Sequence, residues 1–396
     1  MSSFSWLSYS ETERERTRDL ISQFSKRDTR DELGIGRIRD AFADLLFPGT
    51  TTIQTRAKYF LFVPWMYLDL ENRRISSSNI ESRARRHEAQ IIETLLRGDV
   101  PDGVIGRYAK GDLQRFPSNI YWAGLGEWNI RRFRGSQNEY HSSLDVYYEL
   151  QQRAGDDGKT EEPQPNWDPA LPDSPEDFPE SATIDLREQD AEYLRDRILQ
   201  SVPDSMLADL LHEPELPGDP EYPWEYAHRN HLSDEVQEYL YHARNFSEII
   251  HGASLLYNLM LAREATDEEL IEEYSNELDD WVQLVETRLT EYREWDLDRF
   301  WEIVTNASAN TPERMQLFVE RWIEIATNNP EEVAEKDAAL QLIETRERRL
   351  KGGRARLQHQ SALEQWGGEA GTNQLAYRWD IAKIHLKDIF AGLEVE

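Results

Sequence analysis

The side chains with the clearest chemistry are arginines that occur in tight clusters. Arg131, Arg132 and Arg134 follow an aromatic stretch that contains Tyr121 and Trp122. A guanidinium group donates two parallel hydrogen bonds to a phosphate, and an aromatic ring can stack against a base. Two further clusters precede this stretch and consist of Arg73, Arg74, Arg83, Arg85 and Arg86. The pattern predicts contact with nucleic acid; the alternative is that the arginines pair with carboxylates inside their own domain and that the rings are core.

A second basic cluster surrounds a Gly-Gly pair in a stretch that is otherwise rich in acidic residues. Its members are Arg346, Arg348, Arg349, Lys351, Arg354 and Arg356. Cations are favourable at a helix C-terminus, and Gly352 suits the left-handed residue that ends many helices. Six positive charges exceed what such a helix end needs, so we expect the cluster to take part in binding nucleic acid or a protein partner.

Metal chemistry would depend on histidines and carboxylates, because the chain has no cysteine. His228, His231 and His242 are the candidates for binding zinc or manganese. His242 lies among apolar residues, which favours a packing role, so we expect no metal and no other cofactor. The chain also lacks a nucleophile elbow, a His-Glu-x-x-His pattern and a complete dinucleotide-binding fingerprint. The sequence therefore indicates no catalytic centre, although it does not decide whether the protein is an enzyme.

The composition narrows the class of protein. The chain has 396 residues, a net charge of −31 and 39% hydrophobic residues, which is enough to form cores in two or three domains. Only 8 of its 45 basic residues are lysines. Scarce lysine, abundant carboxylates and absent cysteine are typical of the cytosol of salt-in halophiles such as archaea, where acidity is a solubility trait. We see no signal peptide and no apolar run of about 20 residues, so we expect a cytoplasmic protein that does not bind membranes.

The charge is distributed unevenly along the chain. Residues 1–150 carry 22 basic and 21 acidic side chains, whereas residues 151–396 carry 23 basic and 55 acidic ones. A neutral segment in such an acidic protein either faces a polyanion or is buried against another domain or chain. The sequence leaves both interpretations open.

Apolar residues recur at helical spacing through most of the chain, and strand-like alternation is scarce. Helices are predicted over about 35–46, 59–68, 80–95, 117–128, 191–211, 231–264 and 381–389, and a capping box at Ser10–Glu13 predicts one before them. The stretch 59–68 is apolar on all sides, which is typical of a buried central helix. Arg56 lies beside it, and we expect this arginine to form a buried ion pair.

The domain organisation is predicted from a change in composition. Six prolines lie among acidic residues between Ala154 and Glu180, with little apolar periodicity. We therefore predict a charge-neutral, arginine-rich helical domain at 1–150, a proline-rich acidic linker or loop at 151–183, and an acidic helical domain at 184–396. The fold class is expected to be mainly α: a multi-helical protein in two parts, with few or no strands.

Several longer motifs resemble those of one known family. They include Asp28-Thr-Arg-Asp-Glu-Leu-Gly-Ile-Gly36, Ile53-Gln-Thr-Arg56, Pro117-Ser118 with Tyr121-Trp122, Leu255-Leu-Tyr-Asn-Leu-Met-Leu261 and Tyr377-Arg-Trp379. Essentially from end to end, the chain is similar to an uncharacterised prokaryotic family catalogued as domain of unknown function 6361. The resemblance implies no defined activity. By context it implies membership of mobile defence loci that encode helicases or nucleases.

These observations lead to one main functional hypothesis. We expect a non-catalytic, nucleic-acid-associated or adaptor component of a prokaryotic, anti-phage defence assembly. Its partners would be nucleic acid and other proteins of the same locus, with no small-molecule substrate. Two alternatives stay open: an orphan metal-dependent enzyme such as a nuclease, and a purely protein-binding scaffold.

Overall fold

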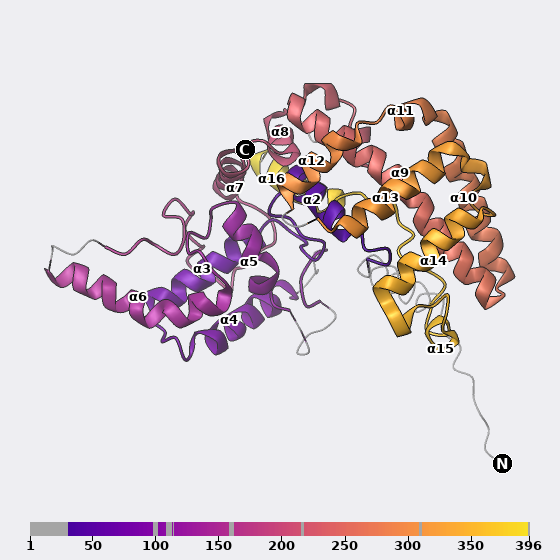
Figure 1. Ribbon diagram of the computed structural model, residues 1–396. Coiled ribbons are helices and arrows are strands. Elements are labelled where there is room, and N and C mark those ends of the chain that lie inside the picture. Colours follow the sequence, from indigo (N-terminus) through magenta and orange to yellow (C-terminus); the bar gives the residue numbers. More distant parts are fainter. Residues whose placement is uncertain are drawn as a thin grey trace, which may run out of the picture. The chain divides into compact units, whose positions relative to one another are not determined.

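The computed structural model describes residues 31–97, 102–107, 113, 115–157, 162–214, 218–308 and 311–394 (Figure 1). Within these ranges the chain is helical, and its only β-type pairing is an isolated antiparallel bridge between Arg131 and Trp167. The predicted mainly α, multi-helical fold is therefore confirmed. The helix predicted to begin at Ser10–Glu13 lies outside the described residues. No described helix combines the length and the apolar character needed to cross a membrane.

The chain divides into two compact units that differ from the predicted domains. The first unit comprises the described part of Met1–Ala41 together with His242–Leu375, and the second comprises Phe42–Tyr241 together with Ala376–Glu396. The division falls within two helices, α2 (Gly36–Leu46) and α9 (Asp234–Ala265). The predicted division placed a linker at residues 151–183, whereas the structure keeps the described part of this segment inside the second unit.

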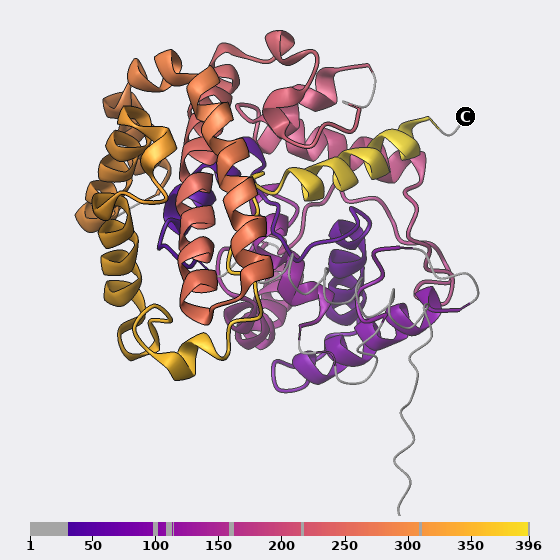
Figure 2. The same cartoon turned by 90° about the vertical axis from the view of Figure 1, so that its right-hand side faces the viewer.

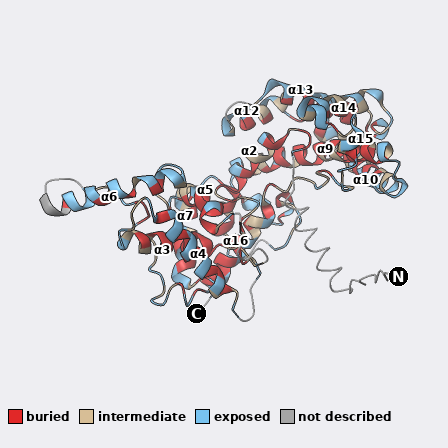
Figure 3. Cartoon of the chain, turned by 90° about the horizontal axis from the view of Figure 1, so that it is seen from below, coloured by how far each residue is buried: buried red, intermediate tan, exposed pale blue. Residues whose placement is uncertain are grey.

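The second unit is built around α3 (Tyr59–Asn72). Its other helices are α4 (Ile80–Leu95), α5 (Pro117–Glu127), α6 (Gln137–Asp157), α7 (Glu188–Ser201), α8 (Met206–His212), η2 (Pro223–Glu225), η3 (Arg229–His231) and α16 (Trp379–Leu393). In α3 every residue from Tyr59 to Tyr67 is buried, as its all-round apolar character predicts, and the helix packs against α4 and α5. Figure 3 shows α3 and α5 largely buried and the outer part of α6 exposed.

The helix predicted over 191–211 forms two helices, α7 and α8, instead of one. Pro203 lies between them, and a proline removes a backbone donor and disfavours helical geometry in the residue before it. Helix α8 begins at Met206. The hydroxyl of the preceding residue, Ser205, accepts a hydrogen bond from the Ala208 N–H at 3.2 Å. Ser205 therefore caps the new helix.

Helix α16 completes the core of the second unit by packing against α7 and α8. Gly392 permits the close approach to α7, because a Cβ atom at this position would lie 2.7 Å from the Cβ of Ala191. Nearer the start of α16, the fully buried His385 ring packs edge-on against Phe60 and Trp128, with ring centroids 5.6 and 6.1 Å apart. Burial lowers the pKa of His385 to about 3, so this imidazole is neutral in the folded protein at ordinary pH.

The proline-rich segment packs as part of the second unit because buried polar groups hold it. The Glu71 carboxylate accepts hydrogen bonds from Asn166 Nδ2 at 3.1 Å and from Trp167 Nε1 at 3.0 Å. The Trp65 indole donates to the carbonyl of Pro172 at 2.6 Å. Trp167 itself is only 2% exposed. Proline content therefore indicated irregular backbone here, but it did not indicate exposure.

Glu88 on α4 faces the start of α5. Its carboxyl group accepts hydrogen bonds from the backbone N–H of Ser118 at 2.7 Å and from the Ser118 hydroxyl at 3.1 Å. The side chain is buried, and burial raises its pKa from the ordinary 4.5 to about 7. The folded protein therefore binds a proton at a pH where an unfolded glutamate has released it.

This shift predicts a pH-dependent stability contribution. Because the folded-state pKa of Glu88 is raised, the contribution is fully present below about pH 4.5 and is lost as the pH rises through about 7. Relative to Glu88→Gln, we expect the wild type to lose about 3 kcal/mol of unfolding free energy between pH 4.5 and 7.5. Urea unfolding of both proteins at several pH values checks this. A difference in unfolding free energy between the wild type and Glu88→Gln that stays constant over this pH range would contradict the prediction.

The first unit consists of helices that pack around the C-terminal part of α9. They are α10 (Glu268–Thr287), α11 (Leu289–Arg293), α12 (Leu297–Ala307), α13 (Glu313–Asn328), η4 (Pro330–Glu332), α14 (Asp337–Lys351), η5 (Gly352–Arg354) and α15 (Gln360–Leu363). Figure 2 shows α9 and α10 side by side. The Trp281 ring of α10 lies directly against Gly252 of α9, and its indole N–H donates to the carbonyl of Glu248 at 2.8 Å.

A candidate anion-binding pocket

Arg346, from the second basic cluster, is a buried structural residue of the first unit. Its guanidinium donates to the carbonyl of Leu33 at 2.7 Å and to that of Gly34 at 3.0 Å. It also stacks over the Phe318 ring, 4.8 Å from the ring centroid. Arg346 therefore fixes the turn that precedes α2, and only 8% of the residue is exposed to any ligand.

Lys351 and Arg356 belong to an internal charge network. Both contact the Glu32 carboxylate, Arg356 at 3.2 Å. The Lys351 ammonium also donates to the Tyr257 hydroxyl at 2.8 Å, and this hydroxyl donates at 2.5 Å to Glu347, which is fully buried. The expectation that all six cations form one binding surface is therefore not met, because carboxylates and carbonyls inside the unit already hold three of them. The remaining three, Arg348, Arg349 and Arg354, are exposed.

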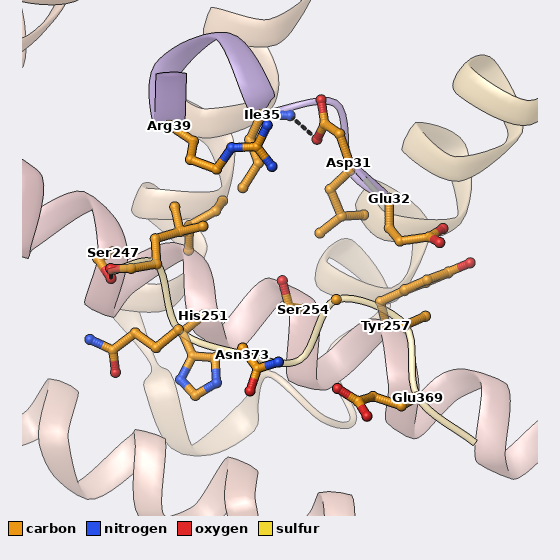
Figure 4. Close-up of a pocket in the computed structure, with 16 residues that line it drawn as sticks. Asp31, Glu32, Ile35, Arg39, Ser247, His251, Ser254, Tyr257, Glu369 and Asn373 are labelled. Atoms are coloured by element: carbon orange, nitrogen blue, oxygen red, sulfur yellow. Dashed lines mark hydrogen bonds between the residues drawn. The ribbon is translucent and has the colours of Figure 1, made fainter. Parts of the chain in front are cut away.

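A small cavity of about 60 Å³ lies beside this network (Figure 4). Ser254 and Tyr257 of α9 line it together with Glu369 and Asn373. Asp31 also lines it, but its carboxylate is engaged at the start of α2, where it accepts a hydrogen bond from the Ile35 N–H at 2.6 Å.

The arginines that follow α3 and those of α4 lie on the surface of the second unit. Arg73 pairs with Asp69 at 3.0 Å and Arg85 pairs with Glu81 at 2.7 Å, each one helical turn earlier in the chain. The other members, Arg74, Arg83 and Arg86, are also exposed. Such surface pairs stabilise a protein little.

Tyr121 and Trp122 are core residues, contrary to the expectation that they stack against bases. Tyr121 is fully buried, and its hydroxyl accepts a hydrogen bond from the Thr55 N–H at 2.8 Å and donates to the Arg56 carbonyl at 2.9 Å. Trp122 is 9% exposed, and the guanidinium of Arg131 covers its ring at 4.6 Å from the centroid. Their burial leaves no free ring face for a base.

The three histidines do not form a metal site. His228, the residue before η3, and His231, the last residue of η3, are exposed in the second unit, with ring centroids 5.3 Å apart. His242 belongs to the first unit, where its buried Nδ1 accepts a hydrogen bond from the Trp295 indole at 2.8 Å. In the part of the chain that the structure describes, no three histidine or carboxylate side chains are arranged to hold a metal ion.

The third predicted cluster lies around a pocket of about 600 Å³ in the second unit. The loop that follows α5 supplies Arg131, Arg132 and Arg134, and α7 supplies Arg197. The complete lining consists of Ala123, Gly126, Glu127, Asn129, Arg131, Arg132, Phe133, Arg134, Gly135, Arg197, Gln200 and Ser201. We call this site the arginine pocket.

Arg131 holds the loop of the arginine pocket in place. Its guanidinium donates to the carbonyls of Trp122 at 3.2 Å, of Gly135 at 3.2 Å, and of Phe133. It contacts no carboxylate among the described residues, and burial lowers its pKa. A half-buried positive charge without a negative partner is costly, which makes an incoming anion favourable at this position.

A single carboxylate is shared by two arginines behind the pocket. Asp168, whose side chain is only 2% exposed, binds the Arg132 guanidinium at 2.7 Å and the Arg197 guanidinium at 3.1 Å. The Tyr193 hydroxyl also donates to Asp168, at 3.1 Å. With Glu127 on the lining, four arginines face two carboxylates, so the described part of the site has a surplus of two positive charges. This surplus lies in a protein whose net charge is −31.

Sequence reasoning missed Phe133, Asp168 and Arg197. The position of Phe133 between two arginines was a local signal for interleaved aromatic and basic side chains. Asp168 and Arg197 gave no such signal, because they lie 36 and 65 residues beyond Arg132 in the chain and reach it only through the fold. Arg131, Arg132 and Arg134, which the sequence groups by their spacing, line this one pocket in the structure.

Comparison with known proteins places the chain in a family without giving it an activity. No curated protein and no solved structure matches it significantly. One family model does match, over residues 1–392, and its description is a family of unknown function, DUF6361. Because this match covers nearly the entire sequence, the chain belongs to the DUF6361 family.

Proposed function

We propose that this protein is a nucleic-acid-associated component that holds phosphate groups in the arginine pocket. The defence assembly in which it would act is inferred from the family resemblance alone. The observation that carries the phosphate contact is the surplus of positive charge in this pocket, where Arg134 is exposed and the half-buried Arg131 lacks a carboxylate partner among the described residues. Guanidinium groups bind phosphate with short, directional hydrogen bonds.

The charge of the whole protein favours a compact contact over a diffuse one. A net charge of −31 repels a polyanion at long range, so binding must rest on a local surplus of positive charge. Concentrated salt reduces this repulsion, because it shortens the Debye length to about 3 Å at 1 M. Bidentate arginine contacts act over shorter distances than that repulsion, and they therefore retain more of their strength in salt.

Arg134 provides the cleanest test. It is exposed, and no hydrogen bond or ion pair links it to another described residue, so Arg134→Ala should leave the melting temperature unchanged. Substituting Arg131 or Arg132 would also break contacts that hold the loop. We expect Arg134→Ala to weaken binding of a single-stranded 12-mer. The slope of log K against log salt should become less steep by about 0.7 for each phosphate that the variant no longer binds. Fluorescence anisotropy across a KCl series measures both quantities.

The matched control is Arg115→Ala, which removes an exposed arginine beside the opposite end of α5. This control should bind the 12-mer as the wild type does. If the wild type binds no oligonucleotide at any KCl concentration, the proposal is wrong. It is equally wrong if the two variants are weakened by the same factor, because the arginine pocket would then have no special role.

A further inference from the structure

We infer that the arginine pocket receives an unpaired nucleotide, with Phe133 as the surface on which the base stacks. This inference rests on the proposed function and adds the ligand class and a specificity-determining residue. Phe133 is the one aromatic side chain among the described residues that line the pocket. It lies between Arg132 and Arg134, so a ring and two guanidinium groups are adjacent along the same loop.

The backbone and the ring of Phe133 are fixed before any ligand arrives. Its N–H donates to the Asn166 carbonyl at 3.1 Å, and its own carbonyl accepts from Arg131. The ring meets Tyr140 edge-on, with centroids 5.6 Å apart and planes at 66°. The side chain is partly exposed and lines the pocket. A prepositioned ring loses little conformational entropy when a base stacks on it.

Polar groups that suit a base edge lie on the same lining. Asn129 is exposed at the end of α5 in a left-handed conformation, with φ of 53°, which asparagine tolerates better than most residues. Gln200 and Ser201, at the end of α7, also line the pocket, and the amide oxygen of Gln200 already accepts a hydrogen bond from Arg197. Amide and hydroxyl side chains pair with the donors and acceptors of bases, while arginines bind the phosphate.

The position of Phe133 on the pocket lining favours an unpaired nucleotide over a duplex. The pocket is open to solvent, and its volume of about 600 Å³ leaves room for one nucleotide. Bases inside a duplex are already stacked on one another and cannot reach a ring at the pocket wall. Stacking on an aromatic side chain is the usual way in which proteins hold single strands, and it tolerates any base.

The experiment compares Phe133→Leu with the wild type on three fluorescent probes of equal length: a single-stranded oligonucleotide, an abasic strand with the same number of phosphates, and a duplex. We expect Phe133→Leu to bind the base-bearing single strand about tenfold more weakly and to bind the abasic strand unchanged. The wild type should prefer the base-bearing single strand to both other probes. Phe116→Leu is the matched control, because Phe116 is a similarly exposed phenylalanine just before α5.

The outcomes separate this inference from the proposed function. If the wild type binds all three probes equally and Phe133→Leu has no effect, the nucleotide inference is wrong while phosphate binding stands. If Phe133→Leu weakens the abasic strand as much as the base-bearing strand, the ring only shapes the pocket, and the inference is again overturned. If no probe binds, the proposed function itself fails. Melting curves for each variant confirm that the compared proteins are folded.

Discussion

Replacing Asp190 with alanine is expected to lower the free energy of unfolding by about 3 to 5 kcal/mol. The Asp190 side chain is fully buried and accepts hydrogen bonds from the Lys58 ammonium at 2.7 Å and from the Arg187 guanidinium at 2.6 Å. Lys58 is itself only 2% exposed, and burial lowers its pKa. Without Asp190 the buried lysine would lose the carboxylate that its ammonium contacts and would keep its hydrogen bond to the Asp185 carbonyl at 2.9 Å.

Because Arg187 also binds Asp190, removing the lysine and removing the aspartate should have different effects on stability. Lys58→Met should lower the free energy of unfolding less than Asp190→Ala does, because Arg187 still neutralises the carboxylate of Asp190. Combining Asp190→Ala with Lys58→Met should restore part of the stability, since no lone lysine charge remains buried. Urea unfolding of the three variants tests this. Strictly additive effects would show that the pair is not coupled and that the prediction is wrong.

Arg56→Ala is expected to destabilise the second unit by a similar amount, about 3 to 5 kcal/mol. The Arg56 Nε atom lies 2.9 Å from both carboxylate oxygens of Asp388, and a terminal nitrogen of the same guanidinium lies 2.8 Å from one of them. Asp388 also accepts a hydrogen bond from the Ala57 N–H at 2.8 Å. The variant would leave this largely buried carboxylate of α16 without its counter-charge.

The loss of unfolding free energy in Arg56→Ala should depend on pH. Burial already raises the pKa of Asp388, and removing Arg56 eliminates the group that opposes this rise. A protonated Asp388 carries no charge that needs a partner. The difference in unfolding free energy between Arg56→Ala and the wild type should therefore become smaller as the pH falls. Arg153→Ala, which breaks an exposed pair with Glu149, should cost at most about 1 kcal/mol. Equal destabilisation by both variants would contradict the buried-pair interpretation.

Local sequence patterns predicted the positions of α2, α3, α4, α5, α9 and α16, but they predicted one helix where α7 and α8 form and no helix at α6. The helical period and the all-round apolar stretch identified α3 as a buried central helix, and the residues of α3 are buried as expected. The requirement that Arg56 find a buried partner was also visible from its apolar surroundings. The identity of that partner was not, because Asp388 lies 332 residues further along the chain. Periodicity reports which face of an element is buried, but it does not report what covers that face.

The same limit explains the mixed outcome at the basic clusters. Residue type and spacing identify cations that can bind phosphate, but a carboxylate far away in the sequence decides which of them are free. Lys351 is engaged by Glu32, 319 residues earlier, whereas Arg134 is exposed and unpaired among the described residues. The bulky rings of Tyr121 and Trp122 were equally compatible with a core and with a binding surface. Their burial is a property of the whole unit and not of the local sequence.

The position of α16 has a consequence for how the protein is made. This helix completes the core of the second unit, yet the ribosome synthesises it after residues 242–375, which belong to the first unit. At about 5 to 20 residues per second, that interval lasts roughly 7 to 27 seconds. Throughout it, the α7 surface that Gly392 later covers is exposed on the nascent chain. The second unit therefore cannot complete its core until α16 has been made, and slower decoding of residues 242–375 prolongs the interval during which that surface is uncovered.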